Sequence, residues 1–239
     1  MLKRTVYCLI AFLLVFSASV PGTARAAEEE DLFFSVPVST IPESEPADPS
    51  WFAGACVIGH SQAVGMRSSL GIPELDYYAI SGLRASYALD CPDFVLPNGR
   101  LGTLRKAMET WSYDRIYVLL GINDCTAYES GLPRFKIAME GVLDLLRETQ
   151  PQAEICLLSL LPVGEMTTDP ERYNRENVIL YSQILKTISR EYRTEYLDLF
   201  RLMADENGYL QSRFNNGDGI HLRTGEYKEL KDFLLRHTW

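Results

Sequence analysis

The sequence has no cluster of basic side chains. Its 23 Lys and Arg residues are outnumbered by 32 Asp and Glu, which gives a formal net charge of −9. A surface that binds nucleic acid needs several Lys or Arg side chains close together to neutralise phosphates, so we expect no nucleic acid as a partner. The same excess of negative charge repels acidic polymers at long range and favours neutral substrates.

Apolar runs long enough to span a membrane are also missing. The N-terminal run, residues 6–20, is shorter than the roughly 20 residues that a spanning helix needs. Lys3-Arg4 precedes this run, and Ala24-Arg25-Ala26 follows it with an A-x-A cleavage pattern. This order predicts a signal peptide over residues 1–26, cleaved after Ala26, and a mature protein that is secreted or at the cell surface without a membrane span. An uncleaved signal anchor is the alternative.

Cysteine and histidine are scarce, with five and three residues respectively. No Cys/His spacing resembles a zinc site, and we expect no metal or other cofactor. Cys56 and Cys156 fall in apolar runs, which predicts buried thiols. Cys91 and Cys125 lie in loop-like sequence, where they either pair or stay free.

Two regions of different composition follow the predicted signal peptide. Residues 27–50 are acidic and rich in proline and contain no Lys or Arg, which predicts a flexible linker. From Trp51 onward, apolar runs alternate with amphipathic ones. Residues 51–239 are enough for one well-buried domain and too few for two.

The predicted elements of this domain alternate between strand and helix. Short, nearly continuous apolar runs predict strands, and runs with one apolar face predict helices, the last of them capped by Thr224. Such an order indicates a parallel sheet covered by helices on both faces, with ligands beyond the carboxyl ends of the strands. The strands are expected at 55–59, 75–80, 115–121, 154–161 and 195–200, and the helices at 133–149, 171–192 and 224–236.

Ser61 lies just beyond the first predicted strand, and Asp218 and His221 lie three residues apart near the C-terminus. A serine hydroxyl is a poor nucleophile unless an oriented base takes its proton. Asp218 can accept a hydrogen bond from one imidazole nitrogen of His221 while the other nitrogen faces Ser61. The alternative is that Asp218 and His221 only cap a turn before the last helix.

Gly82 and Asn123 follow the second and third predicted strands. Attack on an ester carbonyl builds negative charge on oxygen, which preorganised donors must stabilise. The backbone N–H groups of Ser61 and Gly82 and the side-chain amide of Asn123 are candidate donors of such an oxyanion hole. Gly82 as an ordinary turn residue and Asn123 as a loop cap are the alternatives.

In chain order, four short blocks resemble those of the SGNH hydrolases, also called GDSL esterases and lipases. The resemblance extends from residue 55 to about 236. It implies a flavodoxin-like three-layer α/β/α sandwich with a central five-stranded parallel sheet, and ester hydrolysis without a metal. The blocks are Gly59-His60-Ser61, Gly82, Gly121-Ile122-Asn123-Asp124 and Asp218-Gly219-Ile220-His221.

One position departs from the family pattern, because His60 stands where the family usually has Asp. Adjacent side chains on a sharp turn diverge, so we expect His60 to support the turn and not to act as the base. Asp124 is expected to support the site in the same indirect way. The G-x-S-x-G elbow of α/β-hydrolases is a poorer match, since Ala63 replaces the last glycine and only one strand precedes Ser61.

These expectations favour an exported serine esterase that removes acyl groups such as acetyl from small-molecule or carbohydrate esters, cell-wall material among them. A lysophospholipase or thioesterase-type acyl hydrolase is one alternative. A catalytically weak carbohydrate-binding protein that keeps the fold is another. Tyr128 and Phe135, just after the third predicted strand, either line the substrate site or pack a helix.

Overall fold

The computed structural model describes residues 38–126, 128 and 130–239. The predicted signal peptide, its cleavage after Ala26 and the first part of the predicted linker therefore lie outside the described residues. Among the helices of the described part, none is long and apolar enough to cross a membrane.

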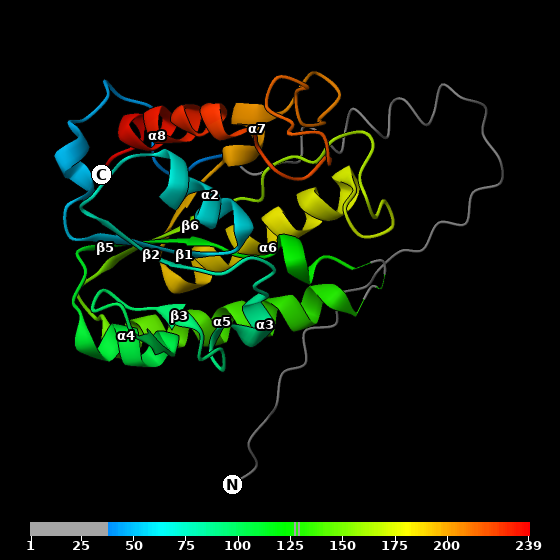
Figure 1. Cartoon of the computed structure of the whole chain (residues 1–239). Coiled ribbons are helices and arrows are strands. Elements are labelled where there is room, and N and C mark those ends of the chain that lie inside the picture. The colour runs from blue at the N-terminus through cyan, green and yellow to red at the C-terminus, as the bar shows by residue number, and fades with distance from the viewer. Residues whose placement is uncertain (1–37, 127, 129) are drawn as a thin grey trace, which may run out of the picture.

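A five-stranded parallel sheet forms the centre of the structure (Figure 1). The strand order is β2-β1-β5-β6-β7, so the first strand along the chain lies inside the sheet and the chain then winds outward in both directions. Doubly wound folds of the flavodoxin type have this order, which confirms the predicted fold class. The strands are β1 (Ala55–Gly59), β2 (Leu75–Ala79), β5 (Arg115–Leu119), β6 (Glu154–Leu158) and β7 (Glu195–Leu197).

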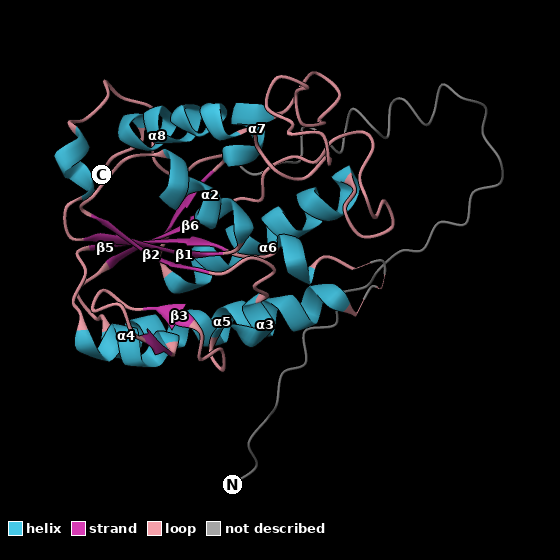
Figure 2. Cartoon of the chain, in the orientation of Figure 1, coloured by secondary structure: helices cyan, strands magenta, loops and turns pink. Residues whose placement is uncertain are grey.

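Helices cover both faces of this sheet (Figures 1 and 2). Alternate strand residues feed two apolar cores, so that Ile58 packs on one side and Val57 on the other. A short antiparallel hairpin, β3 (Phe94–Val95) with β4 (Leu101–Gly102), lies outside the main sheet. One layer contains α3 (Ala85–Ala88), α4 (Leu104–Thr110), α5 (Gly131–Thr149) and α6 (Arg175–Tyr192), and the other contains α2 (Ser61–Ser69), α7 (Leu199–Met203) and α8 (Tyr227–Arg236).

The predicted helix starts at residues 133, 171 and 224 all differ from the structure, and the first of these helices begins at Gly131. The helix expected from residue 171 begins at Arg175, because the Asn174 side chain accepts a hydrogen bond from the backbone N–H of Asn177 and caps the helix there. The prediction that Thr224 caps the last helix is wrong. Thr224 begins a separate 3₁₀ turn, η3 (Thr224–Glu226), and α8 starts only after that turn.

All four described cysteines are free thiols and are buried. This confirms the expectation for Cys56 and Cys156. It also shows that Cys91 and Cys125, for which the sequence leaves pairing open, are unpaired in this structure.

The segment from residue 38 to residue 50 packs on the domain, although the sequence predicts a flexible linker there. The backbone N–H of Thr40 donates to the carbonyl of Tyr196, and the N–H of Tyr196 donates to Thr40 Oγ1, 2.8 Å in each case. Ile41 is only 4% exposed. The segment thus covers part of β7, an edge strand that would otherwise offer its backbone groups to another chain.

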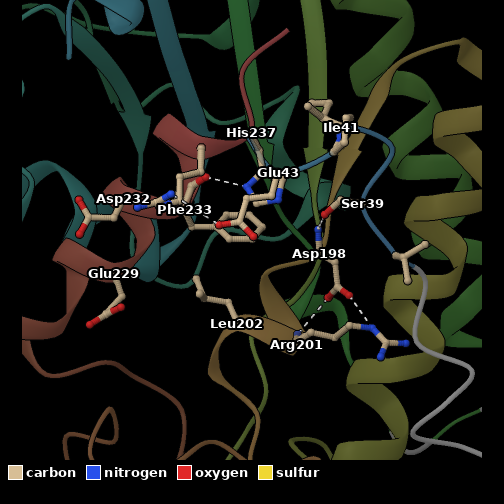
Figure 3. Close-up of a pocket in the computed structure, with 13 residues that line it drawn as sticks. Ser39, Ile41, Glu43, Asp198, Arg201, Leu202, Glu229, Asp232, Phe233 and His237 are labelled. Atoms are coloured by element: carbon tan, nitrogen blue, oxygen red, sulfur yellow. Dashed lines mark hydrogen bonds and ion pairs between the residues drawn. The ribbon is translucent and has the colours of Figure 1, made fainter. Parts of the chain in front are cut away.

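The same segment forms one wall of a pocket of about 610 Å³, whose other walls come from α7 and α8 (Figure 3). Ser39 Oγ accepts a hydrogen bond from the backbone N–H of Asp198, and the Asp198 carboxylate pairs with Arg201 at 2.9 Å. The composition of residues 27–50 did not reveal these contacts, because they are made with residues more than 150 positions away.

We expect Ile41→Ala to lower the free energy of unfolding by about 2 kcal/mol, the lower end of the range for truncating a buried isoleucine. The matched control is Val38→Ala, since Val38 is 60% exposed and its truncation should change stability by less than about 0.5 kcal/mol. Urea unfolding of both variants measures the difference. Equal stabilities would mean that the segment does not pack as described.

Candidate active site

The turn after β1 places Ser61 at the start of a helix. Gly59 is the last residue of β1. A Cβ atom at this position would lie 2.8 Å from the carbonyl oxygen of Leu119 and 2.7 Å from the Cβ of Ala63. Only glycine therefore fits without a shift of its neighbours. Ser61 is the first residue of α2, so its backbone N–H is one of the helical amides that has no partner inside the helix.

Ser61, His221 and Asp218 form a continuous chain of hydrogen bonds. The distance from Ser61 Oγ to His221 Nε2 is 2.8 Å, and that from His221 Nδ1 to Asp218 Oδ2 is 2.7 Å. A carboxylate only accepts hydrogen bonds, so Nδ1 carries the imidazole proton and Nε2 is left as an acceptor for the serine hydroxyl. The structure thus brings together three side chains from opposite ends of the chain in the predicted order.

Asp218 also holds the backbone of its own turn. Its Oδ1 accepts hydrogen bonds from the N–H groups of Ile220 and His221, each 2.8 Å long. Burial raises the pKa of Asp218, but the hydrogen bonds from His221 and Ile220 outweigh burial and leave that pKa below its ordinary value. The carboxylate therefore stays ionised and keeps the His221 ring oriented at neutral pH.

Two further contacts fix the turn that carries His221. Gln62, the buried neighbour of Ser61, donates from Nε2 to the carbonyl of Ile220 at 3.1 Å. Gly219 has a φ of +78° and lies so close to the loop around Met166 that a Cβ would overlap the Met166 carbonyl oxygen. A glutamine inside a helix carries no local signal of such a contact, so the sequence does not predict this role of Gln62.

Gly82 and Asn123 lie on the loops that follow β2 and β5, the two strands that flank β1. Gly82 has a φ of +78°, which favours glycine. Asn123 belongs to a short 3₁₀ turn, η2 (Ile122–Asp124), and its Nδ2 donates to the carbonyl of Leu83 at 3.1 Å. An amide nitrogen has two hydrogens, so one remains for another acceptor.

Asp124 links the same two loops. Its carboxylate accepts hydrogen bonds from the backbone N–H groups of Ala85 and Ser86, at 2.8 and 3.4 Å. Burial raises the pKa of Asp124, and these two N–H groups offset part of that rise. Asp124 thus has the geometry of the indirect support that the sequence predicts.

Arg172 and Tyr181 hold the backbone around Asn123 from the other side, and sequence reasoning missed both. Arg172 donates from Nε to the carbonyl of Cys125 at 2.9 Å and from Nη2 to the carbonyl of Asn123. Tyr181, on α6, donates from its hydroxyl to the carbonyl of Asp124 at 2.7 Å. Three successive carbonyls of the Asn123 loop are thereby fixed by side chains from a separate part of the chain.

His60 is fully buried at the N-cap of α2. Its Nδ1 accepts a hydrogen bond from the backbone N–H of Gln62 at 3.4 Å. Burial, with a smaller contribution from His221, lowers the pKa of His60 to about 3. His60 is therefore neutral at ordinary pH, and it contacts the start of the helix that carries Ser61.

Of the two aromatic residues after β5, Phe135 packs a helix and Tyr128 faces solvent, and both also line a pocket beside Asn123. Phe135 is buried against Tyr181, with ring centroids 4.9 Å apart, whereas Tyr128 is 77% exposed. Within the described ranges, no group of three or more His, Cys, Asp or Glu side chains is placed to hold a metal ion.

Comparisons with solved structures show the same fold at low sequence identity. A GDSL-like lipase from Bacteroides thetaiotaomicron VPI-5482 matches with a TM-score of 0.55 and 14% identity, over 89% of this chain and 95% of that one. An acetyl xylan esterase matches with a TM-score of 0.51 and 15% identity, over 74% and 96%. A peptidoglycan O-acetylesterase matches with a TM-score of 0.52 and 14% identity, over 67% of this chain and 44% of that one.

A comparison with curated proteins gives no match. The family model for the GDSL-like lipase/acylhydrolase family matches residues 59–225, a range that includes Ser61, Gly82, Asn123, Asp218 and His221. Because this match spans most of the chain, the protein belongs to the GDSL-like lipase/acylhydrolase family.

Proposed function

We propose that the protein is a serine esterase in which Ser61 is the nucleophile, His221 the general base and Asp218 the residue that orients His221. The hydrogen-bonded chain from Ser61 Oγ through the imidazole to the Asp218 carboxylate, with links of 2.8 and 2.7 Å, carries this proposal. The membership of an acylhydrolase family supports it.

In the proposed reaction, Ser61 Oγ attacks the ester carbonyl carbon while its proton passes to His221 Nε2. The tetrahedral intermediate then collapses, the bond to the alcohol oxygen breaks, and His221 returns the proton to the leaving alcohol. Water attacks the acyl-enzyme in the second half, again with His221 as base. The carboxylic acid is released and Ser61 regains its proton.

The negative charge of each tetrahedral intermediate needs donors that are already in place. We assign this role to the backbone N–H groups of Ser61 and Gly82 and to the second hydrogen of the Asn123 amide. Because Leu83 accepts the first hydrogen of that amide, the side chain is held in one orientation. The contacts of Arg172 with the loop carbonyls make Arg172 a positioning residue for Asn123.

For the substrate, we propose acyl esters, with acetyl as the preferred acyl group and carbohydrate or cell-wall material as the acceptor. Two structures of the same fold are an acetyl xylan esterase and a peptidoglycan O-acetylesterase. They support the hydrolysis of acetyl esters as a reaction that this fold can catalyse. The signal-peptide pattern of residues 1–26 supports export, which such a substrate requires.

The alternative of a catalytically weak binding protein rests on His60, which replaces the usual Asp. His60 still accepts a hydrogen bond at the start of α2, as an N-cap carboxylate would, so its contacts do not favour that alternative. The enzyme is therefore the function that we propose.

Ser61→Ala tests the proposed nucleophile directly. We expect kcat for p-nitrophenyl acetate to fall by about 10⁶-fold, as it does when the nucleophile of other serine hydrolases is removed. The control is Ser68→Ala on the same helix, because Ser68 is exposed and its hydroxyl donates a hydrogen bond to the carbonyl of Val64 within its own helix. If Ser61→Ala kept most of the wild-type rate, Ser61 would not be the nucleophile.

Asn123→Ala tests the proposed oxyanion donor. We expect kcat to fall by about 10²- to 10³-fold with little change in KM, because the donor acts on charge that is absent from the bound ester. The exposed residue Asn207 provides the control substitution Asn207→Ala. A change confined to KM would instead make Asn123 a substrate-binding residue, and thermal unfolding of the variant reports any loss from the broken contact with Leu83.

A further inference from the structure

A polar pocket of about 360 Å³ opens beside Asn123. Its walls come from the loop after β2, the loop after β5, the first turn of α5 and the loop before α6. Three arginines line it, and they come from three separate parts of the chain: Arg84, Arg134 and Arg172. The hydroxyl-bearing residues Ser86 and Thr126 line it as well.

The side chains of two of these arginines are not held by the fold. Neither the Arg84 nor the Arg134 guanidinium donates a hydrogen bond or forms an ion pair within the described part of the chain, and both residues are exposed to solvent. Burial raises the pKa of the nearby Asp124 carboxyl, and the positive charge of Arg84 offsets part of that rise. Arg172 uses Nε and Nη2 on the carbonyls of Cys125 and Asn123, and Nη1 is not engaged by a described residue. The pocket therefore presents guanidinium donors that are not used by the fold.

The single described carboxylate in the pocket wall, Asp124, is occupied by backbone N–H groups of α3. Among the described lining residues, positive charge thus exceeds negative charge by three to one. This excess is local, because the chain as a whole carries a formal net charge of −9. At about 0.1 M salt the Debye length is about 10 Å, so a group inside the pocket is influenced by these arginines more than by distant acidic residues.

We infer that this pocket binds an anionic group, a carboxylate or a phosphate, carried by the ester substrate. The planar guanidinium matches the geometry of both anions and can donate two parallel hydrogen bonds to either. Asn123 belongs both to the pocket wall and to the proposed oxyanion hole, so a substrate can place its carbonyl at Ser61 and its anionic group among the arginines. This inference rests on the proposed esterase function, and it replaces the expectation of a neutral substrate.

The anionic group can belong to the acyl part or to the alcohol part of the ester, and two pairs of substrates distinguish these sources. The first pair is 4-acetoxybenzoate and its neutral methyl ester, which differ only on the alcohol side. The second pair is the p-nitrophenyl monoester of succinate and p-nitrophenyl butyrate, which differ on the acyl side. Wild type should prefer the anionic member of one pair, and the preference should weaken as salt is raised.

Arg134→Gln and Arg84→Gln should each lower kcat/KM for that anionic ester by about 3- to 10-fold, mainly through KM. The rate with the neutral member of the pair should stay within about 2-fold, because a charge interaction is absent there. Arg134→Lys should keep part of the preference. The matched control is Arg100→Gln in the β3–β4 hairpin, which removes the same charge away from the pocket and should leave both rates unchanged.

Equal losses for the anionic and the neutral ester would overturn the inference, since the arginines would then only support the loops. Unchanged rates for the anionic ester would overturn it too. Calorimetric binding of each anionic ester, 4-acetoxybenzoate and the p-nitrophenyl monoester of succinate, to Ser61→Ala, with and without Arg84→Gln and Arg134→Gln, separates the two proposals. If wild type hydrolyses no ester but the binding of either anionic ester depends on both arginines, the esterase proposal fails and the anion pocket stands. If the binding of both esters is independent of the arginines, the pocket fails.

Discussion

The parallel pairing of β1 with β2 on one side and with β5 on the other decides where the candidate catalytic groups lie. Gly59 at the end of β1 is in register with Ala79 of β2 and Leu119 of β5. The three neighbouring strands therefore end at the same edge of the sheet. Their loops carry Ser61, Gly82 and Asn123, which the sequence places far apart. Without this register, the nucleophile and its proposed donors would not share one edge of the sheet.

A second layer of contacts makes these loops rigid with respect to one another. Asn123 binds the Gly82 loop through the Leu83 carbonyl, and Asp124 binds it through the first N–H groups of α3. Gln62 ties the helix of Ser61 to the turn of His221. Donors that stabilise a transition state must be in place before charge develops, because moving them during the reaction would cost the free energy that they supply.

Most of the fold could be predicted from the sequence, because buried parallel strands are short continuous apolar runs and their helices have one apolar face. All five strands of the main sheet begin at the predicted residue. The start of α8 was missed because the 3₁₀ turn at Thr224 has the same composition as a helix start. The packing of residues 38–50 is not visible in the sequence, because the hydrogen-bond partners of Ser39 and Thr40 come from the other end of the chain and an acidic, proline-rich segment gives no local sign of them.

The residues of the proposed chemistry were visible in the sequence, since nucleophile, base and donor each need a particular residue type beside a turn. The roles of Arg172 and Tyr181 were not visible in the sequence. Both side chains donate to backbone carbonyls of a distant loop, and the sequence around them indicates only a loop and a helix. The arginine pocket was also invisible. Arg84, Arg134 and Arg172 are isolated in sequence, and only the fold shows that they line one pocket in a chain of acidic composition.

The most direct test of the proposed chemistry is the intact mass of the protein after reaction with a fluorophosphonate, which reacts with activated serine hydroxyls. We expect one adduct per molecule, located on Ser61 by peptide mapping, and none in Ser61→Ala. The His221→Ala variant should react far more slowly, because the Ser61 hydroxyl has lost the base that takes its proton. Labelling at another residue, or equally fast labelling of Ser61 in His221→Ala, would contradict the claim that His221 and Asp218 activate Ser61.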